Sequence, residues 1–119
     1  MASTERRGLR QILRATQFSF AGLKAAFAHE ASFRLEVYLF VVLAPLALWL
    51  GDTGLERALL FIPLMLVLIA EITNSAIEAV VDLLHPGHHE LAGRAKDLGS
   101  AAVFLADITV IVVWLLVLL

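Results

Sequence analysis

Acidic and amide side chains recur at helical spacing within one long apolar stretch of this 119-residue chain. At about 100° of rotation per residue, five positions between residues 70 and 82 fall within one arc of roughly 100°. These positions, the acidic stripe, are Glu71, Asn74, Ser75, Glu78 and Asp82. Like charges on one face of a helix are unfavourable without a cation among them, because an unpaired carboxylate stripped of water is costly. The stripe therefore predicts a cationic partner.

The oxygen atoms of the stripe limit the chemistry it could perform. Mg²⁺ takes oxygen ligands, often one or two carboxylates together with phosphate oxygens of a substrate. A lysine can neutralise phosphate as a point charge, and a deeply placed carboxylate can accept the proton of an attacking hydroxyl. The chain offers Lys96, with Asp97 beside it and Ser100 one helical turn further. Together these are the parts of a phosphoryl-transfer site.

Known phosphate and zinc motifs are absent from the chain. Gly87 and Gly93 are wrongly spaced for a P-loop and no Walker-type lysine follows them. His89 and Glu90 begin like a zinc-protease helix, but the second histidine of that motif is missing. We therefore expect His88 and His89 to be solvated loop residues or nucleotide contacts. From the residues alone, a membrane phosphotransferase, an ion pathway and a structural polar network all stay open.

The elements that would position these groups are membrane helices. The chain is 61% hydrophobic, whereas ordinary soluble domains contain roughly 45–50% apolar residues. Residues 33–50, 55–84 and 94–119 are candidates for crossing an apolar layer of about 30 Å, which takes about 20 helical residues. At this length we expect one domain, so residues 1–119 are predicted to form a single all-α membrane domain with three transmembrane helices.

A basic amphipathic segment precedes the first of these spans. Residues 8–28 place apolar side chains on one face, while Arg14 and Lys24 point elsewhere. This pattern predicts a helix on the membrane surface, and a helix covering the protein's own bundle is equally compatible. Just beyond it, Glu30 and Arg34 are four residues apart and could form a surface ion pair.

The distribution of charge along the chain predicts an orientation. Arginine and lysine dominate before residue 37, and Arg94 and Lys96 follow the second connector. The positive-inside bias then places the N-terminus and the second connector in the cytoplasm and the C-terminus outside. The net charge of −2 gives no reason to expect a nucleic-acid partner, and without cysteine a disulfide or thiolate metal site is impossible.

Two long motifs resemble those of a known family. They are Glu-Ile-Thr-Asn-Ser-Ala-Ile-Glu-Ala-Val-Val-Asp at residues 71–82 and His-Glu-Leu-Ala-Gly-Arg-Ala-Lys-Asp-Leu-Gly-Ser-Ala-Ala-Val at residues 89–103. In wording and spacing the chain closely resembles the bacterial integral-membrane diacylglycerol kinases. The resemblance extends to residues 22–27 and 30–34 and covers essentially the whole chain.

The resemblance implies a homotrimer in the bacterial inner membrane, with active sites shared between subunits. The implied reaction moves the γ-phosphoryl group of MgATP to the free hydroxyl of diacylglycerol and gives phosphatidic acid. Glu71 is the implied general base, and Glu30 and Glu78 are the implied ligands of Mg²⁺. The implied nucleotide contacts are Glu30, Glu78, Lys96, Asp97, His89, Asn74 and Asp82. The implied lipid contacts are Glu71, Ser100, Arg14, Ala15, Lys24 and Phe33.

The chain also departs from the family pattern. Gln11 stands where arginine is common, Phe18 where tyrosine is common, and Gly87 where a nucleotide-side acidic residue is expected, with Pro86 nearby. Asp107, in the third span, has no role in this scheme. The related undecaprenol kinases share much of the acidic motif, so undecaprenol is the alternative acceptor. A cation or proton transporter is the alternative of a different class.

Overall fold

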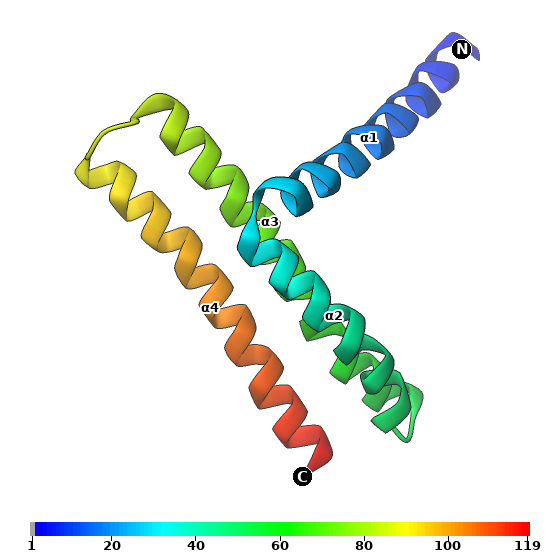
Figure 1. Cartoon of the computed structure of the whole chain (residues 1–119). Coiled ribbons are helices and arrows are strands. Elements are labelled where there is room, and N and C mark those ends of the chain that lie inside the picture. Colours follow the sequence, from blue (N-terminus) through cyan, green and yellow to red (C-terminus); the bar gives the residue numbers. More distant parts are fainter. Residues whose placement is uncertain (1) are drawn as a thin grey trace.

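The structure of the chain is a computed structural model that describes the backbone of residues 2–119 and the side chains from residue 7 onward. Within that part the fold is all-helical, which confirms the predicted class (Figure 1). The four helices are α1 (Ala2–His29), α2 (Ala31–Leu50), α3 (Gly54–Leu84) and α4 (Glu90–Leu118). The first helix therefore begins before the predicted residue 8, and the last begins before the predicted residue 94.

Three of the helices form a bundle in which α3 packs against both α2 and α4. Figure 1 shows α2, α3 and α4 running side by side, while α1 leaves the bundle near the start of α2. The core between α2 and α3 contains Ala44, Ala47, Leu60 and Leu64. Trp114 of α4 donates its indole N–H to the carbonyl oxygen of Leu60 at 3.0 Å and so ties α4 to α3. Small residues at such contacts let helix backbones approach closely.

A short turn reverses the chain between α2 and α3. Thr53 is the N-cap of α3, and its hydroxyl accepts the backbone N–H of Glu56 at 3.1 Å. The carboxylate of Glu56 in turn accepts the backbone N–H of Asp52 at 2.8 Å. This reciprocal arrangement is close to a capping box, which satisfies amide groups that the first turn of a helix leaves free. Local hydrogen bonds therefore fix the turn between the predicted spans 33–50 and 55–84.

The break between α1 and α2 occurs at Glu30, whose backbone is extended with φ −113° and ψ 107°. Arg34 turns back across this break, and its Nη1 donates to the carbonyl oxygens of Phe27 and Ala28 at 2.9 Å each. The ion pair that Glu30 and Arg34 could form is not present among the described residues. The guanidinium instead satisfies carbonyls that the last turn of α1 leaves free.

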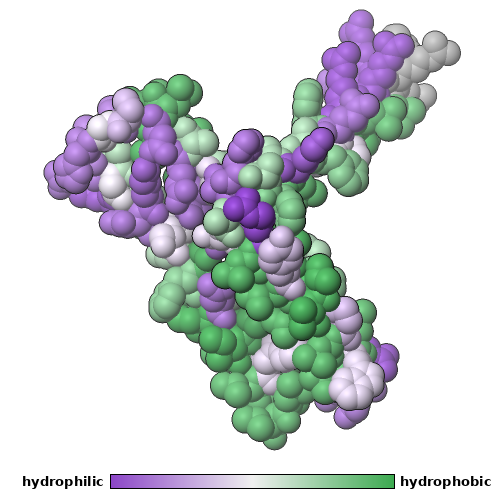
Figure 2. All heavy atoms as spheres, viewed as in Figure 1, coloured by the Kyte–Doolittle hydropathy of each residue, from purple (hydrophilic) through white to green (hydrophobic). Residues whose placement is uncertain are grey.

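Hydrophobic side chains cover most of the bundle in the view of Figure 2, and hydrophilic ones gather on α1 and at the α3–α4 connection. Within the described residues, two helices are long and apolar enough to cross a membrane, namely α2 and α4, with mean hydropathies of 1.8 and 2.7. Many of their large side chains are exposed, and Leu116 is 77% exposed. A surface of this kind is suited to lipid rather than to water.

Candidate active site

Glu71 is the deepest member of the acidic stripe. Its residue surface is 7% exposed, and it is the one buried charged residue among the side chains that the structure describes. Asp107 of α4 acts on Glu71 electrostatically, as do Glu78, further along α3, and Glu30, at the start of α2. The fold thus gathers carboxyl groups from three helices around one region of α3.

The structure brings Lys96 of α4 to the stripe. Its Nζ lies 2.6 Å from Oδ1 of Asp82 on α3, and both side chains are partly exposed. Glu78 also acts electrostatically on Lys96. The antiparallel packing of α3 and α4 makes this pair possible, because the connector at residues 85–89 is short. A partly exposed lysine paired with Asp82 at the end of the helix is placed to meet an anionic ligand.

Asn74 lies on the same face of α3 and contacts Glu78. Its Nδ2 donates to Oε1 of Glu78 at 3.3 Å. Its Oδ1 is buried and accepts no hydrogen bond from the described residues. The amide therefore has one end bonded to a site carboxylate and the other end enclosed.

His89 has a structural role that its sequence context did not reveal. It is the N-cap of α4, and its Nδ1 accepts the backbone N–H groups of Leu91 at 3.1 Å and Ala92 at 3.4 Å. Its ring also stacks on that of His85, with 4.6 Å between the centroids. The sequence did not predict this cap, because the usual N-cap residues are Ser, Thr, Asp and Asn and histidine is not among them.

A small polar hollow of about 150 Å³ lies beside this connector. Asp82, His85, His89 and Lys96 contribute to its lining. The hollow thus joins the ion pair on α3 and α4 to the stacked histidines. It can receive a polar or anionic group at the end of the bundle.

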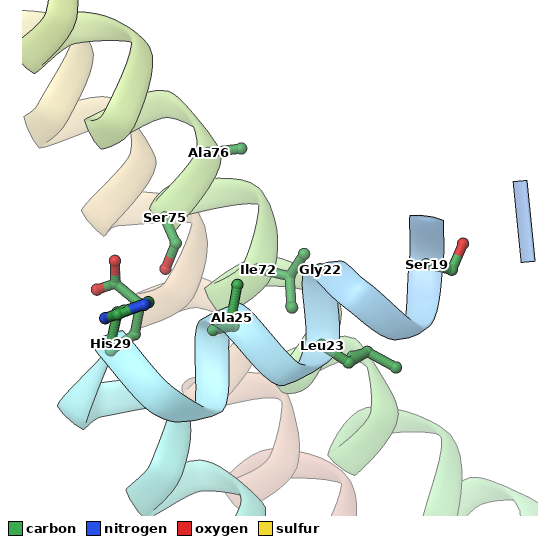
Figure 3. Close-up of a pocket in the computed structure, with 10 residues that line it drawn as sticks. Ser19, Gly22, Leu23, Ala25, His29, Ile72, Ser75 and Ala76 are labelled. Atoms are coloured by element: carbon green, nitrogen blue, oxygen red, sulfur yellow. The ribbon is translucent and has the colours of Figure 1, made fainter. Parts of the chain in front are cut away.

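A larger hollow of about 540 Å³ separates the second half of α1 from α3. In Figure 3, Ile72, Ser75 and Ala76 of α3 lie across this space from Ala25 and His29 of α1. Its walls are mostly apolar, with Glu30 among the few polar side chains. A long apolar molecule with one polar end fits such a space.

Other residues that the resemblance implicates are not joined to the stripe within one chain. Among the described side chains, Arg14, Lys24 and Asp97 form no ion pair, and all three are exposed, as are Ala15 and Ser100. Phe33 is 3% exposed, so in one chain it is a core side chain. The roles of these residues stay predictions.

The donor groups of the site fit a hard cation. No group of three or more His, Asp or Glu side chains that could hold a metal occurs among the residues that the structure describes. Mg²⁺ does not need such a cage, since it commonly takes one or two carboxylates and completes its shell with phosphate and water. Glu30 is suited to this use because it sits at the N-cap of α2 without capping the helix through its side chain.

A second pair of carboxyl groups lies deeper in the bundle. Glu36 of α2 and Asp107 of α4 line a hollow of about 310 Å³ whose other walls include Leu39, Leu64 and Val67. The sequence left Asp107 without a role, and nothing in its spacing from Glu36 indicated that the two would face the same space. The structure joins them but assigns them no chemistry.

Comparison with known proteins adds to this geometry. Residues 17–118 match the family described as prokaryotic diacylglycerol kinase. A diacylglycerol kinase of Escherichia coli K12 is 46% identical over 111 residues, which cover 93% of this chain and 91% of the relative. A diacylglycerol kinase of Pseudomonas aeruginosa is 49% identical over 112 residues, covering 94% and 91% respectively. One from Haemophilus influenzae is 46% identical over 107 residues, covering 90% and 91%.

Proposed function

The chain belongs to the prokaryotic diacylglycerol kinase family, and from this premise we propose that it phosphorylates the free hydroxyl of diacylglycerol with ATP and forms phosphatidic acid. The observation that carries the proposal is that α4 brings Lys96 onto Asp82 at the exposed end of the acidic stripe, whose buried member is Glu71, in a chain from this family. A base, a carboxylate ligand and a phosphate-binding cation are what a phosphoryl transfer to an alcohol needs.

In the proposed reaction, the diacylglycerol oxygen attacks the γ-phosphorus while the bond from that phosphorus to the β,γ-bridging oxygen breaks. ADP leaves, and the hydroxyl proton passes to the carboxylate of Glu71. The buried position of Glu71 keeps bulk water away from the base, and it favours a lipid hydroxyl over water as the acceptor. Lys96 holds the phosphates as a point charge.

Magnesium is the proposed metal, held by Glu30 and Glu78 together with oxygens of ATP. When bound, it neutralises charge on the phosphates. Support comes from the oxygen donors, from the free carboxylate of Glu30 at the N-cap of α2, and from the nearness of both carboxylates to Glu71. The further proposed contacts of the nucleotide are Asp82, Asn74, His89 and Asp97.

The lipid is proposed to enter between α1 and α3. The hollow there is open to the apolar surroundings of the bundle and has Glu30 and Ser75 among its polar residues. The amphipathic α1, with Arg14 and Lys24 exposed, would lie along the membrane surface above it. Ser100 and Ala15 are assigned to the lipid on the resemblance alone.

We further propose three membrane crossings and a homotrimer in the bacterial inner membrane. The packing of α3 against both α2 and α4, the two candidate spans, supports a third crossing by α3. An oligomer is supported by exposed Arg14, Asp97 and Ser100, which one chain does not bring to its own stripe, and the number of three subunits rests on the resemblance alone. A neighbouring subunit could supply them.

The proposed function is tested by incubating the purified chain in mixed micelles with radiolabelled ATP, Mg²⁺ and diacylglycerol. Labelled phosphatidic acid is the expected product, and its absence would contradict the proposal. A parallel incubation with undecaprenol decides the acceptor, because the better substrate shows the higher kcat/KM. Ion flux in proteoliposomes without ATP would instead support a transporter.

A further inference from the structure

The helices α3 and α4 come into unusually close contact at Gly99. This glycine is buried on α4 and faces Asn74 on α3. A Cβ atom added at Gly99 would overlap Oδ1 of Asn74, and it would lie 3.2 Å from Cγ of the same residue. No residue larger than glycine fits unless the Asn74 amide moves.

The enclosed end of this amide explains its orientation. Oδ1 of Asn74 is buried without a hydrogen-bond partner among the described residues, while Nδ2 bonds to Glu78 at 3.3 Å. Gly99 leaves room for this oxygen because it has no Cβ. The contact with Gly99 accommodates the oxygen, and the NH₂ group is left to face the carboxylate of Glu78.

We propose that Gly99 is a positioning residue for the kinase site. By lacking a side chain, it lets the Asn74 amide keep the rotamer that donates to Glu78, and so it orients the carboxylate that meets the metal–nucleotide complex. This inference rests on the proposed function. It adds a residue that touches neither substrate and acts only through Asn74.

Replacing Gly99 with alanine should disturb the site more than the fold. The atoms in the way belong to the end of a movable side chain, so rotation of Asn74 relieves the overlap without separating the helices. Glu78 then loses its N–H donor. A hydrogen bond to a charged group is worth about a tenfold change or more in an equilibrium constant. We therefore expect the KM for MgATP and the Mg²⁺ concentration for half-maximal activity to rise about tenfold, with a smaller change in kcat.

Gly93 provides a matched control on the same helix. A Cβ at Gly93 meets no protein atom within 4 Å, so Gly93→Ala changes helix propensity without moving Asn74. Because Gly93 also lines the polar hollow beside the connector, the control is read from the comparison of its effects in two backgrounds. Both alanine substitutions should be made in the wild-type chain and in Asn74→Ala. Because truncation of Asn74 removes the obstructing atoms, Gly99→Ala should then have little further effect on KM, whereas Gly93→Ala should act equally in both backgrounds.

The midpoint of thermal unfolding in detergent supplies a readout that does not depend on activity. Gly99→Ala should lower this midpoint less, or raise it more, in the Asn74→Ala background than in the wild type. Gly93→Ala should shift the midpoint equally in both backgrounds. Equal effects of Gly99→Ala in both backgrounds, on KM and on the midpoint, would overturn the inference. A wild-type chain without kinase activity would overturn the proposed function, while the unfolding midpoints would still decide the contact between Gly99 and Asn74.

Discussion

Glu71 is separated from the cation of the site by about two to three turns of α3. Lys96 pairs with Asp82 and is influenced by Glu78, whereas Glu71 is surrounded by apolar groups and other carboxyl groups. A carboxylate in these surroundings is better suited to accept a proton than to bind phosphate. The position of each carboxyl along α3 therefore separates the proposed base from the proposed metal ligand.

This separation predicts the behaviour of Glu71→Gln. The amide keeps the size of the side chain but cannot take the hydroxyl proton, so kcat should fall by about a hundredfold or more. MgATP affinity, measured by titration of a non-hydrolysable analogue, should stay within about twofold, because the phosphate-binding groups are retained. Glu90→Gln is a suitable control, since Glu90 is exposed and its ion pair among the described side chains is with Arg94 at 3.8 Å. Loss of nucleotide binding in Glu71→Gln would argue against a role as base.

Glu78 is predicted to act on the metal rather than on the proton. In Glu78→Gln the Oε1 atom can still accept the Asn74 N–H, so the local geometry is preserved while the negative charge is lost. The Mg²⁺ concentration for half-maximal activity should rise about tenfold or more, and a large excess of Mg²⁺ should restore part of the activity. An unchanged Mg²⁺ dependence would remove Glu78 from the proposed metal site.

At the scale of the elements, the start of α4 fixes how Lys96 meets α3. His89 caps this helix with Nδ1 and leaves Nε2 free for a ligand. The two roles can be separated by substitution. Asparagine is a strong N-cap, whereas alanine is a poor one.

His89→Ala should lower the free energy of unfolding by about 1 kcal/mol, while His89→Asn should retain most of it. If Nε2 also contacts the nucleotide, both variants should show a raised KM for ATP, because neither offers a ring nitrogen. The comparison requires unfolding midpoints and ATP kinetics on the same preparations. A normal KM in His89→Asn would assign the residue to capping alone.

Helical periodicity was sufficient to predict the stripe, since Glu71, Asn74 and Glu78 depend only on spacing along one helix. The pairing of Asp82 with Lys96 could be expected in outline, because a short connector forces α4 back along α3. The contact between Gly99 and Asn74 could not be predicted from the sequence, because it depends on the distance between two helix axes.

The position of Arg34 shows the same limit at the junction of α1 and α2. A spacing of four residues predicts an ion pair only where the helix is continuous, and the extended backbone of Glu30 interrupts it. The carbonyls at the end of α1 then become the partners of the guanidinium. Such free carbonyls occur only at the ends of helices, and sequence patterns do not define those ends to the residue.

For the molecule as a whole, the polar site and the apolar bundle must be arranged relative to a membrane. The connector at residues 51–53 and the connector at residues 85–89 lie at opposite ends of α3. If α3 crosses the membrane with α2 and α4, the two connectors face opposite compartments. The positive-inside bias of Arg94 and Lys96 would then place the second connector, and with it the proposed nucleotide site, in the cytoplasm where ATP is available.

The absence of cysteine makes this arrangement directly testable, because any single introduced cysteine is the only thiol in the chain. Asp52→Cys and Gly87→Cys place a thiol in exposed positions on the two connectors. A membrane-impermeant maleimide added to intact spheroplasts should label Asp52→Cys, and it should label Gly87→Cys only after the membrane is opened. Labelling of both variants in intact spheroplasts would contradict the crossing of α3. The reverse pattern would place the kinase site on the side without ATP, and so would contradict the proposed reaction as well as the orientation.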